Sequence, residues 1–448
     1  MDLRTPVTLV TGLNREANAR MANALAVPGT AFISHDLRAL PLGYVVRQTR
    51  TVIGDADQFA IEGVPLEHGC ATCTLRYDLL PMLRTLHRTD GVERIVVVLD
   101  PAFEPEPVVA EILGTLVETD DLPEGVAGDD VVVRATVTAV DGAAWLNDAT
   151  GDLTLCEAGL SEVEDERTLA QVAVAQARFA DVLVAECSGD PDDRYEQARL
   201  CAALRRINPA AIQTVLHPGD PFGPRELLVS LAATRPESRR GRLHTAFDPL
   251  LDGCPPLESD CGIAVVTFEA DRAFHPERLH DAIDVLLDGV ITARGRLWLT
   301  SSPDDVLWLE SAGGSLGVSR VARWIAARGE DELSSVTPEV RAMASLRWDD
   351  EHGDRHSSIV AVTHRAEPAE IEQALRDALL TDDELARGAD YLAALPSPFG
   401  DIHLDPCDSS SPSKASSSPS EASSSPSTVE GVARDLAADS INSEETTR

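Results

Sequence analysis

The sequence predicts an α/β protein with a doubly wound parallel sheet in residues 1–220, followed by a small α+β domain in residues 262–381. Continuous apolar runs alternate with helical patterns through the first half, which is typical of a parallel sheet covered by helices on both faces. A second series of strands and helices starts at Ile263, after a segment rich in Pro, Gly and Arg. Residues 221–261 are therefore interpreted as a linker.

The first domain is predicted to open with a buried strand at residues 6–11, a turn at Gly12 and a helix at residues 15–26, which is rich in strong helix formers. A short apolar segment follows at residues 31–34. Further strands are predicted at residues 94–99, 131–140, 182–185 and 212–216, and a further helix at residues 79–87.

The second domain mixes helical and extended patterns. Pro276 stands at a favoured first helical position and Gly289 follows the end of the pattern, so residues 276–287 are predicted to form a helix. Strands are predicted at residues 263–269, 296–299, 306–309 and 357–363, and helices at about residues 318–327 and 367–380. Repeated serines and prolines and few apolar residues predict a disordered tail over residues 404–448.

The chain is strongly acidic, with 75 Asp and Glu residues against 38 Lys and Arg residues and a formal net charge of −37. Such a surface repels phosphate backbones, which argues against direct binding of DNA or bulk RNA. It favours a basic protein partner, although solubility alone would also explain it. No stretch approaches the ~20 uninterrupted apolar residues of a membrane span, and the N-terminus lacks a signal-peptide layout, so a cytoplasmic protein is expected.

Three segments carry a resemblance to a known family. They are TPVTLVTG at residues 5–12, EHGCATCTLRYDLL at residues 67–80, and FHPERLHDAIDVLLDGVITARGRLWL at residues 274–299 followed by GDRHSSIVAV. Together they resemble the CobW-type GTPases (CobW/HypB/UreG), a P-loop family linked to metal delivery. The resemblance implies a P-loop NTPase-like first domain and a CobW C-terminal domain.

The phosphate loop of this chain departs from the P-loop pattern. In GxxxxGK[ST], glycines let backbone N–H groups wrap the phosphates, Lys meets their charge, and Ser or Thr holds Mg²⁺. Counting from Gly12, the last three positions are Ala17, Asn18 and Ala19, and the only lysine of the chain is Lys414 in the tail. Gly12, Asn18 and Ala19 therefore mark a degenerate site, at which GTP with Mg²⁺ is not expected to bind well.

Two other nucleotide motifs of the family are also altered. Where the family reads guanine with NKxD, this chain has Glu186, Cys187 and Gly189, with Asp190 one residue further on. Where the family has Glu-Thr-x-Gly after a strand, this chain has DPAFEPEP, which contains no glycine. The sequence therefore assigns no catalytic residue and predicts inefficient GTP hydrolysis, unless an arginine such as Arg15 or Arg20 replaces the missing lysine.

Cys70 and Cys73 form the pair of cysteines whose spacing suits a metal ligand set. Two thiolates at this spacing can bind one tetrahedral Zn²⁺ at ~2.3 Å each, and His68 is the nearest candidate for a third ligand. The family motif has another cysteine where this chain has Thr72. Two alternatives stay open: a redox-active thiol pair at a helix N-terminus, or half-buried cysteines without a function.

Histidines form a weaker candidate site in the second domain. His275 and His280 lie near one predicted helix, and His352 and His356 flank Asp354. Four histidines near a carboxylate could bind a metal. Because they belong to the segment that resembles the family's C-terminal domain, a shared structural role is the preferred interpretation.

The eroded phosphate loop, the GCxxCT motif and RGRLWL with WLESAGG resemble one CobW branch in particular, the ribosome hibernation factor-recruiting GTPases. That resemblance implies a zinc-responsive adaptor that brings a hibernation factor to the ribosome when zinc is limiting. The alternative is a zinc metallochaperone that delivers metal to client proteins.

Overall fold

The computed structural model describes residues 3–54, 56–66, 71–119, 122–161, 165–217, 219, 223–234, 247, 249–251, 253–334 and 336–399. The predicted tail at residues 404–448 lies outside these residues, as do His68 and Cys70. Within the described part of the chain, no helix is long and apolar enough to cross a membrane.

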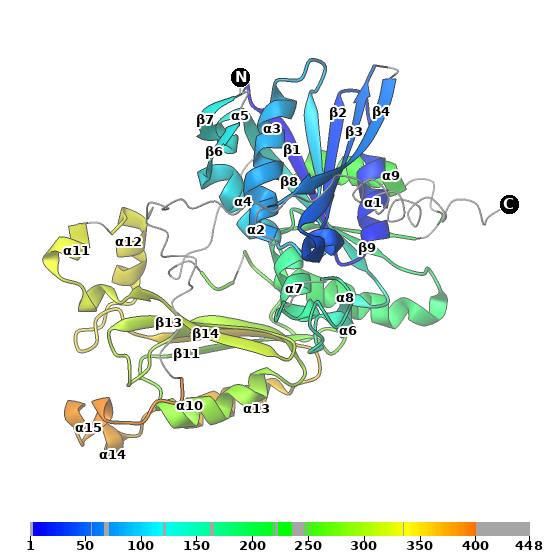
Figure 1. Ribbon diagram of the computed structural model, residues 1–448. Coiled ribbons are helices and arrows are strands. Elements are labelled where there is room, and N and C mark those ends of the chain that lie inside the picture. Colours follow the sequence, from blue (N-terminus) through cyan, green and yellow to red (C-terminus); the bar gives the residue numbers. More distant parts are fainter. Residues whose placement is uncertain are drawn as a thin grey trace.

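The first sheet confirms the predicted α/β fold and adds two antiparallel strands to it. Its eight strands run in the order β10-β9-β8-β1-β5-β2-β3-β4, and the six from β10 to β2 are parallel. β3 and β4 extend the sheet as an antiparallel hairpin (Figure 1). The strands are β1 (Thr5–Thr11), β2 (Thr30–Asp36), β3 (Tyr44–Ile53), β4 (Ala56–Pro65), β5 (Arg94–Val98), β8 (Val131–Asp141), β9 (Val182–Glu186) and β10 (Ile212–Leu216).

Helices cover both faces of this sheet, as the continuous apolar strands require. α1 and α9 bury Met21 and Leu227 against one face, whereas α3, α4, α7 and α8 pack on the other. Their bounds are α1 (Arg15–Ala24), α3 (Leu80–His87), α4 (Pro105–Gly114), α7 (Leu169–Phe179), α8 (Arg194–Ile207) and α9 (Gly223–Ala233). α9 lies within residues 221–261, so part of the segment interpreted as a linker belongs to the first sheet's packing.

Short elements complete the first half of the chain. A small hairpin of β6 and β7 packs beside α3 and α5. These elements are η1 (Leu37–Leu42), α2 (Ala71–Thr74), η2 (Leu75–Leu79), β6 (Leu116–Thr119), β7 (Leu122–Val126), α5 (Ala127–Asp130), α6 (Trp145–Asp148) and η3 (Pro191–Asp193).

The second sheet is antiparallel throughout, in the order β11-β15-β12-β13-β14. α10 and α13 bury Leu279 and Leu375 against one face. The strands are β11 (Ala264–Ala270), β12 (Val290–Leu297), β13 (Asp305–Ala312), β14 (Ser315–Arg323) and β15 (Ser357–Thr363). The helices are α10 (Pro276–Ile283), η4 (Asp284–Leu286), η5 (Ile325–Ala327), α11 (Glu330–Ser334), α12 (Pro338–Leu346), α13 (Pro368–Asp377), α14 (Asp382–Leu385) and α15 (Ala389–Ala393).

The helix predicted at about residues 318–327 is wrong, because most of this segment is strand β14. Ala312 pairs with Ser315 across the two-residue turn Gly313–Gly314, and Gly313 has φ +52°. A glycine turn of this length favours a hairpin, and pairing with β13 then outweighs the local helical pattern.

The two sheets share an apolar core. Ile263, Ile291 and Val362 of the second half pack with residues of α7 and α8. At the tip of the β13–β14 hairpin, the Gly314 N–H donates to the Gly151 carbonyl at 3.1 Å. The second domain is therefore packed against α7 and α8 rather than tethered at a distance.

Candidate functional site

The turn after β1 joins this buried strand to α1, where the sequence resemblance places the phosphate loop. Gly12 has φ +154°, and a Cβ at this position would lie 2.5 Å from the Ala139 carbonyl oxygen, so only glycine fits. Asn14 caps α1, its side chain accepting from the backbone N–H groups of Glu16 and Ala17 at 3.0 and 3.1 Å. The sheet and the helix therefore require this turn whether or not it binds a ligand.

At the start of the helix that follows, Ala17 and Asn18 are buried at the positions where the P-loop pattern has glycine and lysine. Asn18 is 1% exposed, and its Nδ2 donates to the Gly12 carbonyl at 2.8 Å. Its Oδ1 is buried and has no hydrogen-bond partner among the described residues. Ala17 is buried at the position where the P-loop pattern has its second glycine. An amide replaces the cation here, and a Cβ stands where backbone approaches phosphate.

Arg15, one of the two arginines named as a substitute for the missing lysine, is already bound by a carboxylate. Its Nη1 lies 2.5 Å from Oδ2 of buried Asp100 and 3.9 Å from Asp36. Asp100 also accepts from the backbone N–H groups of Leu37 and Ala102. Burial raises the pKa of Asp100, although Arg15 opposes this. The second guanidinium nitrogen of Arg15, Nη2, is buried without a hydrogen-bond partner among the described residues.

Arg20, the other candidate substitute for lysine, is engaged at the position of the altered guanine motif. Its Nη2 lies 2.5 Å from Glu186 Oε2 at the end of β9. The adjacent Cys187 is buried, and burial raises the pKa of its thiol to about 11. Because both arginines are paired with carboxylates and Asn18 places an amide in the loop, these residues fit a magnesium–nucleotide complex poorly.

The cysteine helix, as we call residues 71–87, begins directly after Cys70 and contains Cys73. It consists of α2, a π-helical turn η2 and α3. Cys73 is partly exposed. Because Cys70 and His68 lie outside the described residues, the predicted ligand set Cys70, Cys73 and His68 stays a prediction. The described residues themselves hold no cluster of three potential metal ligands.

A buried polar network supports the π-helical turn of the cysteine helix. His35 Nε2 on β2 lies 2.5 Å from Oδ2 of Asp78, and both residues are only 6% exposed. Arg47 on β3 binds the other oxygen of Asp78 and also binds Glu62 on β4. π-helical turns are rare and are frequently found at functional sites, because they change the direction of a helix face. Here the turn places the Asp78 carboxylate between His35 and Arg47.

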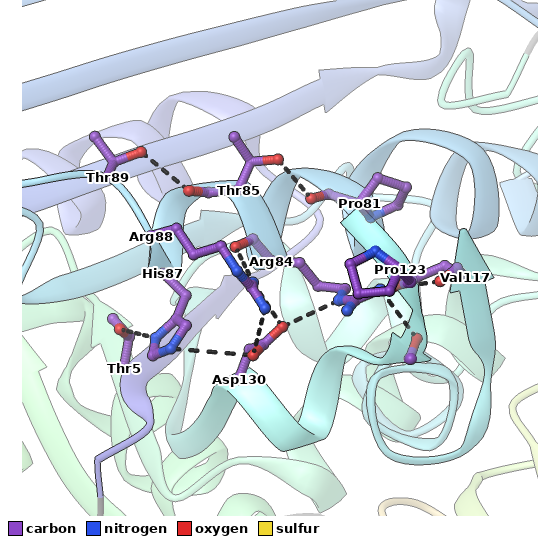
Figure 2. Close-up of polar contacts among 11 residues, drawn as sticks. Thr5, Pro81, Arg84, Thr85, His87, Arg88, Thr89, Val117, Pro123 and Asp130 are labelled. Atoms are coloured by element: carbon purple, nitrogen blue, oxygen red, sulfur yellow. Dashed lines mark hydrogen bonds and ion pairs between the residues drawn. The ribbon is translucent and has the colours of Figure 1, made fainter. Parts of the chain in front are cut away.

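A second network holds the other half of the cysteine helix (Figure 2). The guanidinium of Arg84, a 4%-exposed residue, donates to Asp130 at 3.0 Å and to the carbonyls of Val117 and Pro123. Arg88 binds the same carboxylate at 2.9 Å. Burial disfavours the Asp130 carboxylate, but hydrogen bonds from Arg88 and Arg84 outweigh it and lower the pKa of Asp130. α3 is thereby fixed to β6, β7 and α5.

Two of the histidines considered as metal ligands, His352 and His356, pack against tryptophan rings. The His356 ring lies 5.5 Å from Trp324 and the His352 ring lies 4.9 Å from Trp298, measured between centroids. The Asp354 carboxylate accepts from two backbone N–H groups at 2.9 Å. These contacts accord with the preferred structural interpretation of the histidines.

Several residues of these networks were missed from the sequence. His35 and Asp78 are 43 residues apart, and Arg84 and Asp130 are 46 residues apart, so no local pattern joins them. Asp100 had a signal, because a carboxylate directly after a buried parallel strand lies at the functional edge of such a sheet.

Residues 46–214 match the family described as "CobW/HypB/UreG, nucleotide-binding domain", and residues 263–379 match "Cobalamin synthesis protein cobW C-terminal domain". The protein "Zinc chaperone Rv0106" of Mycobacterium tuberculosis is 41% identical over 407 residues, which cover 90% of this chain and 95% of that protein. "Zinc-regulated GTPase metalloprotein activator 1" of Dictyostelium discoideum is 24% identical over 338 residues, covering 73% of this chain and 68% of that protein.

Among solved structures, the Zn(II)-bound YjiA GTPase from E. coli is similar to this chain with a TM-score of 0.35 and 13% sequence identity. The similarity covers 84% of this chain and 99% of YjiA.

Proposed function

The chain belongs to the CobW family, and we propose that it is a zinc carrier that passes the metal to a protein partner without hydrolysing GTP. The observation that carries this proposal is the phosphate loop, in which Asn18 binds Gly12 and Arg15 binds Asp100. The names of the relatives connect the family with zinc, and the matched nucleotide-binding domain connects it with nucleotides. Weak or absent GTP and Mg²⁺ binding is thus a property proposed for this chain and not for the family.

Cys70, Cys73 and His68 are the proposed zinc ligands. Thiolate and imidazole are ligands that Zn²⁺ prefers, and the thiols lose their protons when the metal binds. Three ligands leave one position of a tetrahedral site for a group from the partner. Cys73 is partly exposed, which suits a site from which metal must leave. The two buried networks at Asp78 and Arg84 hold the helix that carries it.

The second candidate function is recruitment of a hibernation factor to the ribosome under zinc limitation. The net charge of −37 favours it, because an acidic surface attracts basic proteins such as those bound to ribosomal RNA. In this function the cysteines report zinc status and the second domain holds the partner.

Zinc titration of the purified full chain tests the carrier function. We expect one zinc ion per chain, and at least about 100-fold weaker binding in Cys70→Ser/Cys73→Ser, since two thiolate ligands are lost. Cys156→Ser/Cys254→Ser is the matched control, because both thiols are exposed and lie elsewhere in the sequence. Equal affinity in the two double variants would contradict the proposed ligands.

The partner distinguishes the two functions. The tagged chain is purified from its own cells grown with and without zinc, beside Cys70→Ser/Cys73→Ser. Zinc enzymes that co-purify and gain zinc from the loaded chain would favour the carrier. Ribosomal proteins or a hibernation factor that co-purify in a zinc- and cysteine-dependent manner would favour the recruiter.

A further inference from the structure

β4 forms an open edge of the first sheet. It is the last strand in the sheet order, beyond β3 (Figure 1), and within the described part of the chain no strand pairs with its outer side. Nearly every one of its ten residues is exposed or partly exposed, and Phe59 is 60% exposed. The outer backbone N–H and C=O groups of an edge strand are available for pairing with another chain.

This edge has two charged side chains, Asp57 and Glu62, and both are paired with arginines of β3, so it carries few of the features that usually prevent pairing. Proteins protect edge strands with short length, lysine, proline or a bulge. β4 has ten residues where strands average about five to six. It contains no lysine, its one proline is the final residue Pro65, and its ladder with β3 runs without a register shift.

The side chains of β4 define what a pairing strand would carry. Asp57, Phe59 and Ile61 share one face of the strand, and Gln58, Ala60 and Glu62 share the other. Cross-strand neighbours pair apolar with apolar and acidic with basic side chains. A segment that suits this edge therefore has β-branched or aromatic residues opposite Phe59 and Ile61. Asp57 and Glu62 are paired with Arg50 and Arg47 of β3 but stay about half exposed, so Lys or Arg of the segment would share these carboxylates.

β4 is also linked to the cysteine helix. Glu62 binds Arg47, which binds Asp78 of the π-helical turn, which binds buried His35. Along the chain, Pro65 at the end of β4 precedes Cys70 by five residues. A strand added to β4 would thus lie on the sheet edge that leads directly into the zinc ligands.

We propose that the edge of β4 docks an extended, basic segment of the partner protein by strand addition. The proposal rests on the proposed function in assigning this partner as the recipient of zinc. Charge selects the occupant: a chain of net charge −37 attracts a basic segment, whereas a second copy carries the same charge and repels it.

The test uses the zinc-loaded full chain and a fluorescent ten-residue peptide of alternating Val and Lys. A second peptide is N-methylated at alternate amides, which removes backbone donors and keeps the charge. By fluorescence anisotropy we expect the N-methylated peptide, and the Phe59→Lys variant with the plain peptide, to show at least about tenfold weaker binding. Val321→Lys is the matched control, because Val321 is 45% exposed on β14, the edge strand of the second sheet. We expect it to bind like wild type.

Three outcomes would overturn the docking proposal. Equal binding of the N-methylated peptide would show that charge alone drives association, and no binding of either peptide would remove the site. Dimerisation of the wild type that Phe59→Lys abolishes would assign the edge to a second copy. Zinc titration of the same samples separates the two proposals: peptide binding without zinc binding refutes the zinc carrier alone, and zinc binding without peptide binding refutes the docking edge alone.

Discussion

The phosphate loop and the cysteine helix belong to the same domain, and each follows a strand of the first sheet, but their polar groups are used differently. In the phosphate loop, the side chains that would face a ligand bind the protein itself: Asn18 binds Gly12, and Arg15 binds Asp100. In the cysteine helix, buried networks at Asp78 and Arg84 support the helix, while Cys73 stays partly exposed.

A loop can therefore be required by the packing of the sheet without binding a ligand. Gly12 is required by its close approach to Ala139, so the loop persists for the packing of the sheet. The networks around the cysteine helix hold a partly exposed thiol in place, which packing alone does not require. The cysteine helix is therefore the better candidate for the working site of the domain.

Among the variants predicted here, Arg84→Met should have the largest effect, which is a loss of stability. It leaves the Asp130 carboxylate and the carbonyls of Val117 and Pro123 without their shared donor, so we expect a loss of about 3 kcal/mol in the free energy of unfolding. Arg88→Met is the control, because Arg88 binds the same carboxylate from a 41%-exposed position and should cost less than about 1 kcal/mol. Urea unfolding measures both, and equal losses would refute the anchoring role of Arg84.

Asp78→Ala should have the next largest effect. It removes the partner shared by buried His35 and Arg47, and we expect it to cost about 2 kcal/mol and to speed amide hydrogen exchange in residues 71–79. Glu62→Ala removes the exposed partner of the same Arg47 and should cost less than about 1 kcal/mol. Unchanged exchange in Asp78→Ala would separate this network from the cysteine helix.

Restoring the P-loop pattern should allow the phosphate loop to bind GTP more tightly. Ala17→Gly/Asn18→Lys/Ala19→Thr replaces the amide on Gly12 with a cation and adds a magnesium ligand, so we expect GTP affinity to rise at least about tenfold, or ~1.4 kcal/mol. Ala17→Gly/Asn18→Gln/Ala19→Thr controls for the charge. Calorimetric titration with GTP and Mg²⁺ measures both. If the wild type binds GTP as tightly as the restored variant, the side chains of the loop do not prevent nucleotide binding, and the proposal is contradicted.

The smallest predicted effect is a pH dependence at the anchor of the cysteine helix. The pKa of Asp130 is lowered in the folded protein, so its contribution is complete above the ordinary carboxyl pKa of 3.8 and is lost progressively as the pH falls below 3.8 through the lower pKa of the folded state. Between about pH 5 and pH 3, the free energy of unfolding measured with urea should fall further in wild type than in Asp130→Asn, by less than about 1 kcal/mol. An identical pH dependence in the two proteins would contradict the lowered pKa.

Much of the fold was predictable because parallel strands buried on both faces form continuous apolar runs. The predicted strands at residues 94–99, 182–185 and 212–216 agree with β5, β9 and β10 to within one residue at either end. The β3–β4 hairpin was missed because exposed antiparallel strands mix polar and apolar residues, as in Gln48 and Arg50. β14 was mistaken for a helix because its strand form depends on pairing with β13.

The candidate site was predictable where it depends on residue type and not where it depends on distant contacts. The absence of lysine and of the second glycine predicted the degenerate loop. The sequence did not reveal that Asn18 folds back onto Gly12, or that Arg20 binds Glu186 166 residues away. The Arg20–Glu186 pair is brought together by the sheet order, which local patterns do not encode.

The most direct test of the account measures zinc transfer from the loaded chain to a zinc-binding indicator dye, without nucleotide, with GTP and Mg²⁺, and with GDP and Mg²⁺. If the cysteine helix carries the metal and the phosphate loop does not bind nucleotide, the transfer rate and the zinc affinity are the same in all three conditions. A change of several-fold that requires GTP, and that Arg15→Ala abolishes, would show that the loop still controls the metal and would contradict the account.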